Sequence, residues 1–121
     1  MRKILTTLLL CAAATSGFAQ TATELVGKWQ LVGIKDPNGQ SLNVEEAVGT
    51  KEVYQIFAAP DTFEGVVGSQ RIPGKWSLSS DNKWLTVRAE GGSTKFRMDS
   101  FTAKTRVIYA EGVGTLTYEK R

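Results

Sequence analysis

The residues that most often carry catalysis or bind metals are scarce in this chain of 121 residues. It contains no histidine, the commonest general base and metal ligand. Its one cysteine, Cys11, lies close to the N-terminus. The only adjacent carboxylates, Glu45 and Glu46, lie in a polar segment that we expect to be exposed, and no base stands beside the serines. The sequence therefore predicts a protein that is not an enzyme and that uses no metal or cofactor.

Aromatic side chains are the most informative residues for a possible binding function of this sequence. In a small β-barrel they either fill the interior or line a cavity for an apolar ligand, and the sequence leaves both uses open. We take as candidate ligand-binding residues those expected to line the interior, with one cation, Arg88, to orient a polar head. The other candidates are Trp29, Tyr54, Phe63, Trp76, Phe96, Met98, Tyr109 and Tyr118.

The first 19 residues have the composition of a secretory signal peptide. Arg2 and Lys3 form a positive start, an apolar run covers 4–14, and small residues precede a cleavage point after Ala19. The run is too short to span a bilayer as a helix of the mature chain. We expect export to the periplasm or the outside of the cell. The alternative is a lipoprotein site at Cys11, which would tether the protein to a membrane.

Removal of this segment changes the composition of the domain, which we expect to cover 20–121. The 15 basic residues lose Arg2 and Lys3, so 13 face 12 acidic ones and the net charge falls from +3 to +1. Charges of both signs are interspersed, and no basic stripe suggests nucleic acid. Without Cys11 the domain has no disulfide, so its core alone must stabilise it.

Short apolar runs separated by turn residues predict an all-β domain. Eight strands in an up-and-down order would close into a small antiparallel barrel without exposed edges, although an open two-sheet sandwich also fits. Pro73 is expected in a loop before the fourth strand. The expected strands cover 28–34, 51–58, 62–68, 74–78, 83–90, 93–101, 104–110 and 115–120.

One connection, 40–50, is polar and lacks the alternation of a strand. Asn43 and Glu46 have the spacing of a helix N-terminus, which predicts a short helix or an ordered loop. Such a segment could cover one mouth of the barrel as a lid, or it could be a plain surface connection.

The frame Gly-Lys-Trp-x-Leu occurs twice, at 27–31 and at 74–78. The similarity ends with these five residues, so a duplication does not explain it. In an eight-stranded barrel the two frames would begin the first and fourth strands. We expect Trp29 and Trp76 to point inward from opposite walls, and each glycine to let the chain bend at a barrel end. The space between the two indoles then decides whether a ligand fits.

Gly27-Lys28-Trp29 resembles the Gly-x-Trp motif of the first strand of lipocalins, and the rest of the domain is similar to short, secreted lipocalin-like domains of bacteria. Two departures are the lack of glycine in the turn at 60–62 and the short chain. The matching positions are Phe57, Asp61, Thr62, Phe63, Gly74, Trp76, Leu78, Leu85, Val87, Leu116 and Tyr118.

This resemblance implies a barrel that binds a small hydrophobic or amphipathic molecule. It also implies that a basic side chain covers Trp29, for which Arg106, Lys120 and Arg121 are candidates. The alternative function is that of a filled barrel acting as a protein-interaction module of the cell envelope.

Overall fold

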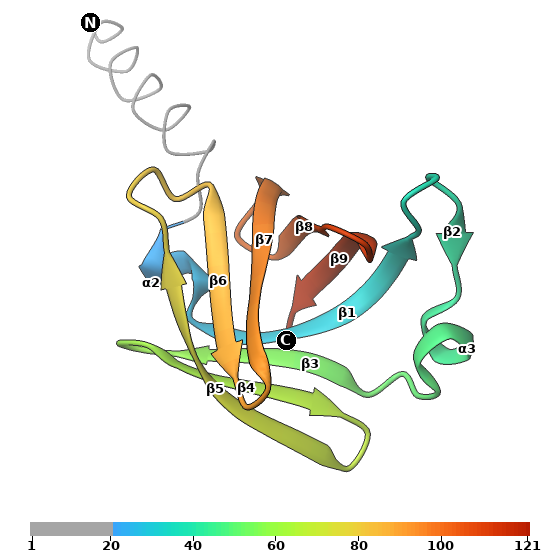
Figure 1. Ribbon diagram of the computed structural model, residues 1–121, viewed down its shortest axis with the longest axis horizontal. Coiled ribbons are helices and arrows are strands. Elements are labelled where there is room, and N and C mark those ends of the chain that lie inside the picture. Colours follow the sequence, from blue (N-terminus) through green and yellow to red (C-terminus); the bar gives the residue numbers. More distant parts are fainter. Residues whose placement is uncertain (1–20) are drawn as a thin grey trace, which may run out of the picture.

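The computed structural model describes residues 21–121, so the predicted signal peptide and Cys11 lie outside the described residues. Two short helices and nine strands make up this part of the chain (Figure 1). In chain order they are α2 (Ala22–Leu25), β1 (Gly27–Lys35), β2 (Ser41–Leu42), α3 (Val44–Val48), β3 (Val53–Ala58), β4 (Thr62–Val67), β5 (Gln70–Leu78), β6 (Trp84–Ala89), β7 (Gly92–Phe101), β8 (Thr105–Ala110) and β9 (Gly114–Lys120).

The strands form one antiparallel sheet that closes on itself. Each strand from β3 to β8 pairs with the next along the chain, and β1 pairs with both β3 and β9. The eight strands other than β2 therefore make a closed barrel, while β2 is a two-residue addition to the end of β1. The predicted up-and-down barrel is confirmed, and the open sandwich is wrong.

One predicted boundary is wrong, because Pro73 lies within β5 and not in a loop. Trp76 donates its backbone N–H to the carbonyl of Asp61 on the β4 side. Since backbone groups alternate in direction along a strand, the nitrogen of Pro73 faces the β6 side. There β5 has no partner, because the pairing with β6 stops at Gly74. Proline therefore occupies a position in this strand where no N–H is needed.

Helix α2, which the sequence did not predict, closes one end of the barrel. Thr21 and Glu24 form a capping box at its start. Leu25 is fully buried at its end, and its carbonyl accepts a hydrogen bond of 2.9 Å from the indole Nε1 of Trp29. The short helix thus holds an apolar plug over the first strand, and we call this the closed end.

Helix α3 lies at the opposite end of β1, in the segment predicted to be a helix or an ordered loop. Asn43 caps it by accepting the N–H of Glu46 at 2.9 Å, which confirms the predicted cap. Val44, its first residue, packs against the barrel core. Among residues 21–121, no helix is long and apolar enough to cross a membrane.

Candidate functional site

The closed end of the barrel interior is filled by a row of stacked side chains. The guanidinium of Arg106 lies 5.0 Å from the ring of Trp29 and 5.2 Å from that of Phe57. Phe57 in turn meets Trp76 edge to face at 5.8 Å. The row runs from one Gly-Lys-Trp frame to the other, so the two indoles point inward as expected. Arg106 and Phe57 occupy the space between them, where the sequence had left room for a ligand.

Arg106 is a cation enclosed in this apolar interior. It is 0% exposed, and a third ring, that of Tyr118, lies 4.6 Å from its guanidinium. Its Nη2 donates a 2.8 Å hydrogen bond to Oε1 of Gln55, while Nε and Nη1 have no partner within residues 21–121. Burial lowers the pKa of Arg106 to about 10, so the side chain stays charged at neutral pH. The three π faces and one amide oxygen compensate part of its lost hydration.

The implied basic cover over Trp29 is present, and two of the three candidates supply it. Besides Arg106, the ammonium of Lys120 lies 5.3 Å from the Trp29 ring. Arg121 binds Gln30 and Glu119 instead. Tyr118 is buried beside Arg106, and burial raises the pKa of its phenol to about 12, so it is neutral at physiological pH. This end of the barrel is therefore a structural cluster, and Arg106 is the buried charge within it.

Three candidates expected in the interior point outward instead. Tyr54 donates its hydroxyl to Glu52 at 3.0 Å and stacks under Lys28, Tyr109 lies 4.7 Å below the guanidinium of Arg97, and Arg88 is exposed. Residues 53, 55 and 57 of β3, and residues 106, 108 and 110 of β8, face the core. Because side chains alternate along a strand, Tyr54 and Tyr109 must face the opposite way.

The other candidates do contribute to the interior, but as core. Trp29, Phe63, Trp76, Phe96 and Tyr118 are buried in one apolar cluster, and Met98 packs against it. Both indoles also donate to backbone carbonyls near the barrel end, since Nε1 of Trp76 binds Ala58 at 3.0 Å as that of Trp29 binds Leu25. In both frames, therefore, the tryptophan Nε1 binds the backbone of another segment, at Leu25 and at Ala58 respectively.

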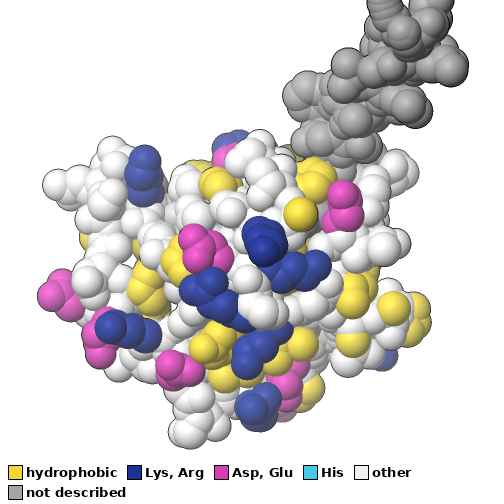
Figure 2. Space-filling model, turned by 180° about the vertical axis from the view of Figure 1, so that it is seen from behind, with side chains coloured by type: hydrophobic (Ala, Val, Ile, Leu, Met, Phe, Trp, Pro, Cys, Tyr) yellow, Lys and Arg dark blue, Asp and Glu magenta, His cyan; other side chains and the backbone are white. Residues whose placement is uncertain are grey.

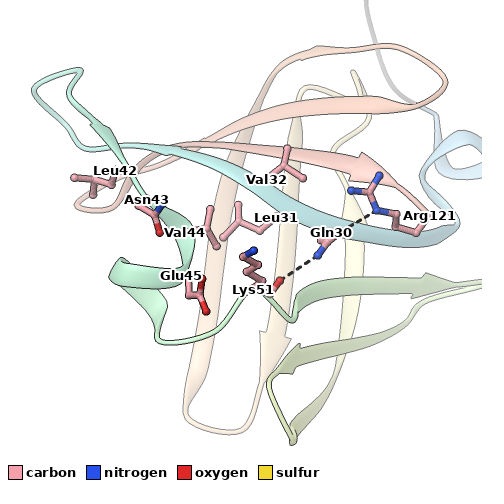
Figure 3. A pocket seen from close by; sticks show the side chains of 9 residues that line it. All are labelled: Gln30, Leu31, Val32, Leu42, Asn43, Val44, Glu45, Lys51 and Arg121. Atoms are coloured by element: carbon pink, nitrogen blue, oxygen red, sulfur yellow. Dashed lines mark hydrogen bonds between the residues drawn. The ribbon is translucent and has the colours of Figure 1, made fainter.

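An open pocket lies away from this cluster, where β1 and β3 diverge. Their pairing covers only Gly27 to Gln30 of β1, and α3 with the loop that follows it spans the widening gap. The pocket has a volume of about 410 Å³ (Figure 3). Its lining residues are Gln30, Leu31, Val32, Leu42, Asn43, Val44, Glu45, Lys51 and Arg121. We call it the α3 pocket.

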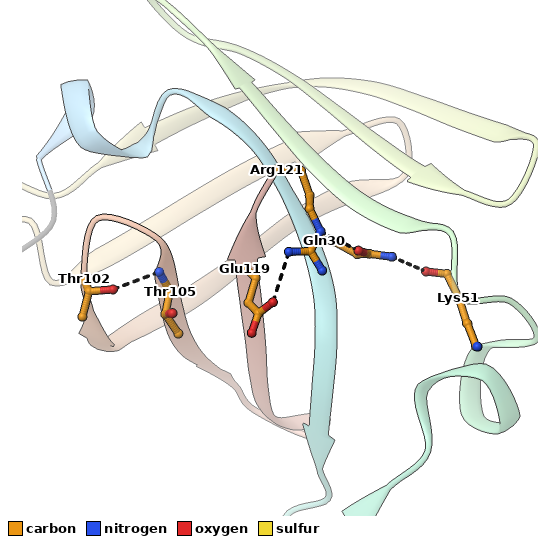
Figure 4. Close-up of polar contacts among 6 residues, drawn as sticks. All are labelled: Gln30, Lys51, Thr102, Thr105, Glu119 and Arg121. Carbon is orange, nitrogen blue, oxygen red and sulfur yellow. Dashed lines mark hydrogen bonds and ion pairs between the residues drawn. The ribbon is translucent and has the colours of Figure 1, made fainter.

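The α3 pocket is held in shape by Gln30. Its side-chain Nε2 donates to the carbonyl of Lys51 at 3.1 Å, and its Oε1 accepts from Nε of Arg121 at 2.8 Å (Figure 4). A second nitrogen of Arg121 binds Glu119 on β9 at 3.1 Å. One amide therefore ties the loop after α3 to β1 and to the end of β9.

The walls of the α3 pocket are half apolar and half polar. Leu31 and Val44 lie at its base, where it meets the core, and Val32 and Leu42 keep 39% and 42% of their surface exposed. Lys51 extends its ammonium into the pocket (Figure 3), and Glu45 supplies a carboxylate. None of these residues was a sequence candidate. The sequence indicated this region only through the segment 40–50, for which a lid over the barrel mouth was one of two expectations.

The surface of the barrel carries both charges. Figure 2 shows lysine and arginine side chains gathered in the middle of one face, with acidic and apolar side chains around them. Neighbouring charges of opposite sign agree with the composition, which predicts an ordinary solvated surface.

The closed eight-stranded barrel, the first-strand tryptophan and its basic cover define a lipocalin-like fold. No protein-family model and no curated protein matches the sequence at a significant level. Solved structures do match it. A lipocalin-like protein from Bacteroides uniformis ATCC 8492 aligns over 81% of this chain and 99% of its own, at 18% identity and a TM-score of 0.65.

Two further structures support the same fold. An uncharacterized protein from Bacteroides eggerthii DSM 20697 is 16% identical, with a TM-score of 0.62 over 79% of this chain and 98% of its own. A DUF4847 family protein from Bacteroides vulgatus ATCC 8482 is 13% identical, with a TM-score of 0.52 over 78% and 91%. At these identities the likeness concerns the fold.

Proposed function

We propose that this protein is a non-catalytic, exported barrel that binds a small amphipathic molecule in the α3 pocket. The observation that carries the proposal is the composition of that pocket, in which apolar side chains meet a lysine and a glutamate where β1 and β3 diverge. Binding sites for small molecules are concave and apolar with a few polar groups that orient the ligand. In this proposal the ligand binds in the α3 pocket, beside the segment 40–50, and not at the filled closed end of the barrel.

The geometry supports an orientation for such a ligand. Its apolar part would lie on Leu31, Val44 and Leu42, which continue the barrel core outward. Its polar group would lie between Lys51 and Glu45, so a zwitterionic or hydrogen-bonding head fits better than a doubly charged one. The composition of the expected domain, 20–121, agrees with a binding role, because it contains neither histidine nor cysteine, from which nucleophile and metal sites are usually built.

We predict that Val44→Lys weakens the binding of an amphipathic probe at least tenfold, because it places a charge at the apolar base of the pocket. The probe is a lysophosphatidylcholine with a short acyl chain, added below its micelle concentration. Binding is followed by the fluorescence of the tryptophans and by isothermal titration calorimetry.

The matched control is Val48→Lys. Val48 lies on the same helix and is 37% exposed, but it does not line the pocket. This variant should bind like the wild type. Equal losses in both variants, or binding by the wild type that does not saturate at one molecule per chain, would contradict the proposal. Thermal unfolding of both variants shows whether the barrel is intact.

Export rests on the first 19 residues, which resemble a signal peptide. We expect the mature protein outside the cytoplasm to begin at Gln20. The intact mass of protein isolated from a periplasmic or culture fraction measures this directly. A chain that begins at a lipid-modified Cys11 would support the tethered alternative, and an uncleaved cytoplasmic chain would contradict export.

A further inference from the structure

The barrel has a second opening, along the seam between β7 and β8. The two strands pair only from Arg97 and Tyr109 onward, so the first half of β7 (92–96) has a partner on its β6 side alone. A closed barrel was expected to leave no free strand edge. This seam leaves one.

Two local features separate the strands here. The register of β7 against β8 shifts between Met98 and Ser100, and such a bulge increases twist and bends the strand. The hairpin from β8 to β9 is held against β1, because Lys35 pairs with Thr115 and Gly114 lies directly against the carbonyl of Lys35, with no space for a side chain. The gap between β7 and β8 therefore follows from the register shift in β7 and from the close packing of Gly114 against β1.

The free edge presents hydrogen-bonding groups that the barrel does not use. Met98 donates its N–H to Lys83, toward β6. By alternation, the N–H and carbonyl groups of Ser93 and Lys95 point away from β6 and into the seam. Both residues are exposed. A row of unpaired strand groups is a template for another strand.

Side chains around the seam form a cleft of about 480 Å³. On the β6 side the cleft is lined by Trp84, which is 37% exposed and has the ammonium of Lys95 4.9 Å from its ring. On the side of the β8–β9 turn it is lined by Val113, which is 51% exposed. Thr94 and Ala110 lie at its base. Lys95 has no acidic partner among residues 21–121, whereas Arg97 is paired with Asp99.

A second free edge, on β5, is protected. In β5, Pro73 lies where an N–H would otherwise face the open β6 side. Proline at an edge is one of the ways in which proteins prevent strand addition. The β7 edge has no such block, and it has an exposed aromatic ring and an unpaired cation beside it.

We propose that the free edge of β7 binds an extended segment of a partner protein by strand addition. The residue opposite Thr94 points into the cleft, on the side of Ala110. The residue opposite Lys95 points outward and is acidic, since opposite charges stabilise cross-strand pairs. The partner segment therefore carries an acidic residue opposite Lys95, next to a residue that points into the cleft. This proposal is independent of the α3 pocket.

The test uses three capped five-residue peptides, VEAEV, VQAQV and VKAKV, whose palindromic order fits either strand direction. We expect the acidic peptide to bind about tenfold more tightly than the basic one, by fluorescence anisotropy of labelled peptides. Amide hydrogen exchange measured by NMR should slow at Ser93 and Lys95 when the acidic peptide binds. Phe96, whose N–H already faces β6, serves as the internal reference.

Three variants test whether the peptide binds at the edge of β7. Lys95→Pro removes an edge N–H and should abolish binding, whereas Lys95→Gln should bind and no longer distinguish the acidic from the basic peptide. Arg71→Pro, on the β5 edge that Pro73 already blocks, is the matched control and should bind like the wild type. If Lys95→Pro does not fold, the exchange of Ser93 and Lys95 in the wild-type protein carries the test.

Two results would overturn the proposal. One is that no peptide slows exchange at Ser93 and Lys95. The other is that these amides are protected without peptide in a dimer that dissociates on dilution, which would assign the edge to a second copy of this chain.

Discussion

Replacing Gln55 with leucine should lower the free energy of unfolding by about 3–5 kcal/mol, a loss comparable to much of the stability of a domain of this size. Gln55 accepts the only hydrogen bond that the side chain of Arg106 donates within residues 21–121. Leucine would leave the buried guanidinium with aromatic faces alone, and an unpaired buried charge is among the costliest defects in a protein core.

The same reasoning gives a smaller effect for the other partner. Arg106→Met removes the charge and leaves only the amide oxygen of Gln55 without a donor, which costs about 1–3 kcal/mol. The double variant removes both polar groups and should lie close to the wild type, because apolar residues often replace buried ion pairs without loss. The two substitutions are therefore expected to be strongly non-additive.

Urea unfolding of the wild type and the three variants, followed by tryptophan fluorescence, measures this cycle. Additive losses would show that Gln55 and Arg106 contribute separately. A double variant less stable than Gln55→Leu would show that the cation itself stabilises the barrel through its three aromatic neighbours.

Replacing Gly74 with alanine should destabilise the barrel by about 2–3 kcal/mol, the second largest effect that we expect. Gly74 belongs to the second Gly-Lys-Trp frame. A methyl group there would overlap the carbonyl oxygen of Arg88 on β6, and backbone atoms cannot move aside as a flexible side chain can. The frame needs glycine for the close approach of two strands, whereas the sequence suggested a bend.

Gly65 is the matched control, since it lies on the neighbouring strand and on the same face of the sheet. Its nearest neighbour would be a ring carbon of Phe63, 3.4 Å from the new methyl group. Gly65→Ala should therefore change stability by less than about 1 kcal/mol, and it could raise it by restricting the unfolded chain. Equal losses for the two variants in thermal or urea unfolding would contradict this account of Gly74.

The sequence predicted the strands well because each carries its own signal. In β7, Phe96 and Met98 alternate with charged residues, and both contribute to the core. The cap at Asn43 depends on a local hydrogen bond, which the residue type specifies. Helix α2 was missed because four residues are too few for a helical period to be visible.

The site was predicted less well, for a reason of geometry. Alternation separates the two faces of a strand but does not say which face is inside, so Tyr54, Tyr109 and Arg88 were assigned to the wrong side. Alternation also does not show how much space is left between side chains inside the barrel. That Arg106 and Phe57 fill the space between Trp29 and Trp76 depends on side chains from four strands meeting inside the barrel.

By itself, then, the sequence predicted an antiparallel barrel of eight strands with two inward tryptophans. These are properties of local alternation and turn chemistry, which act within a few residues of the chain. Only the tertiary structure decided that the closed end is solid, that a pocket opens under α3, and that β7 keeps a free edge. Those depend on where strands diverge, and divergence is set by bulges, close backbone contacts and register between segments distant in the chain.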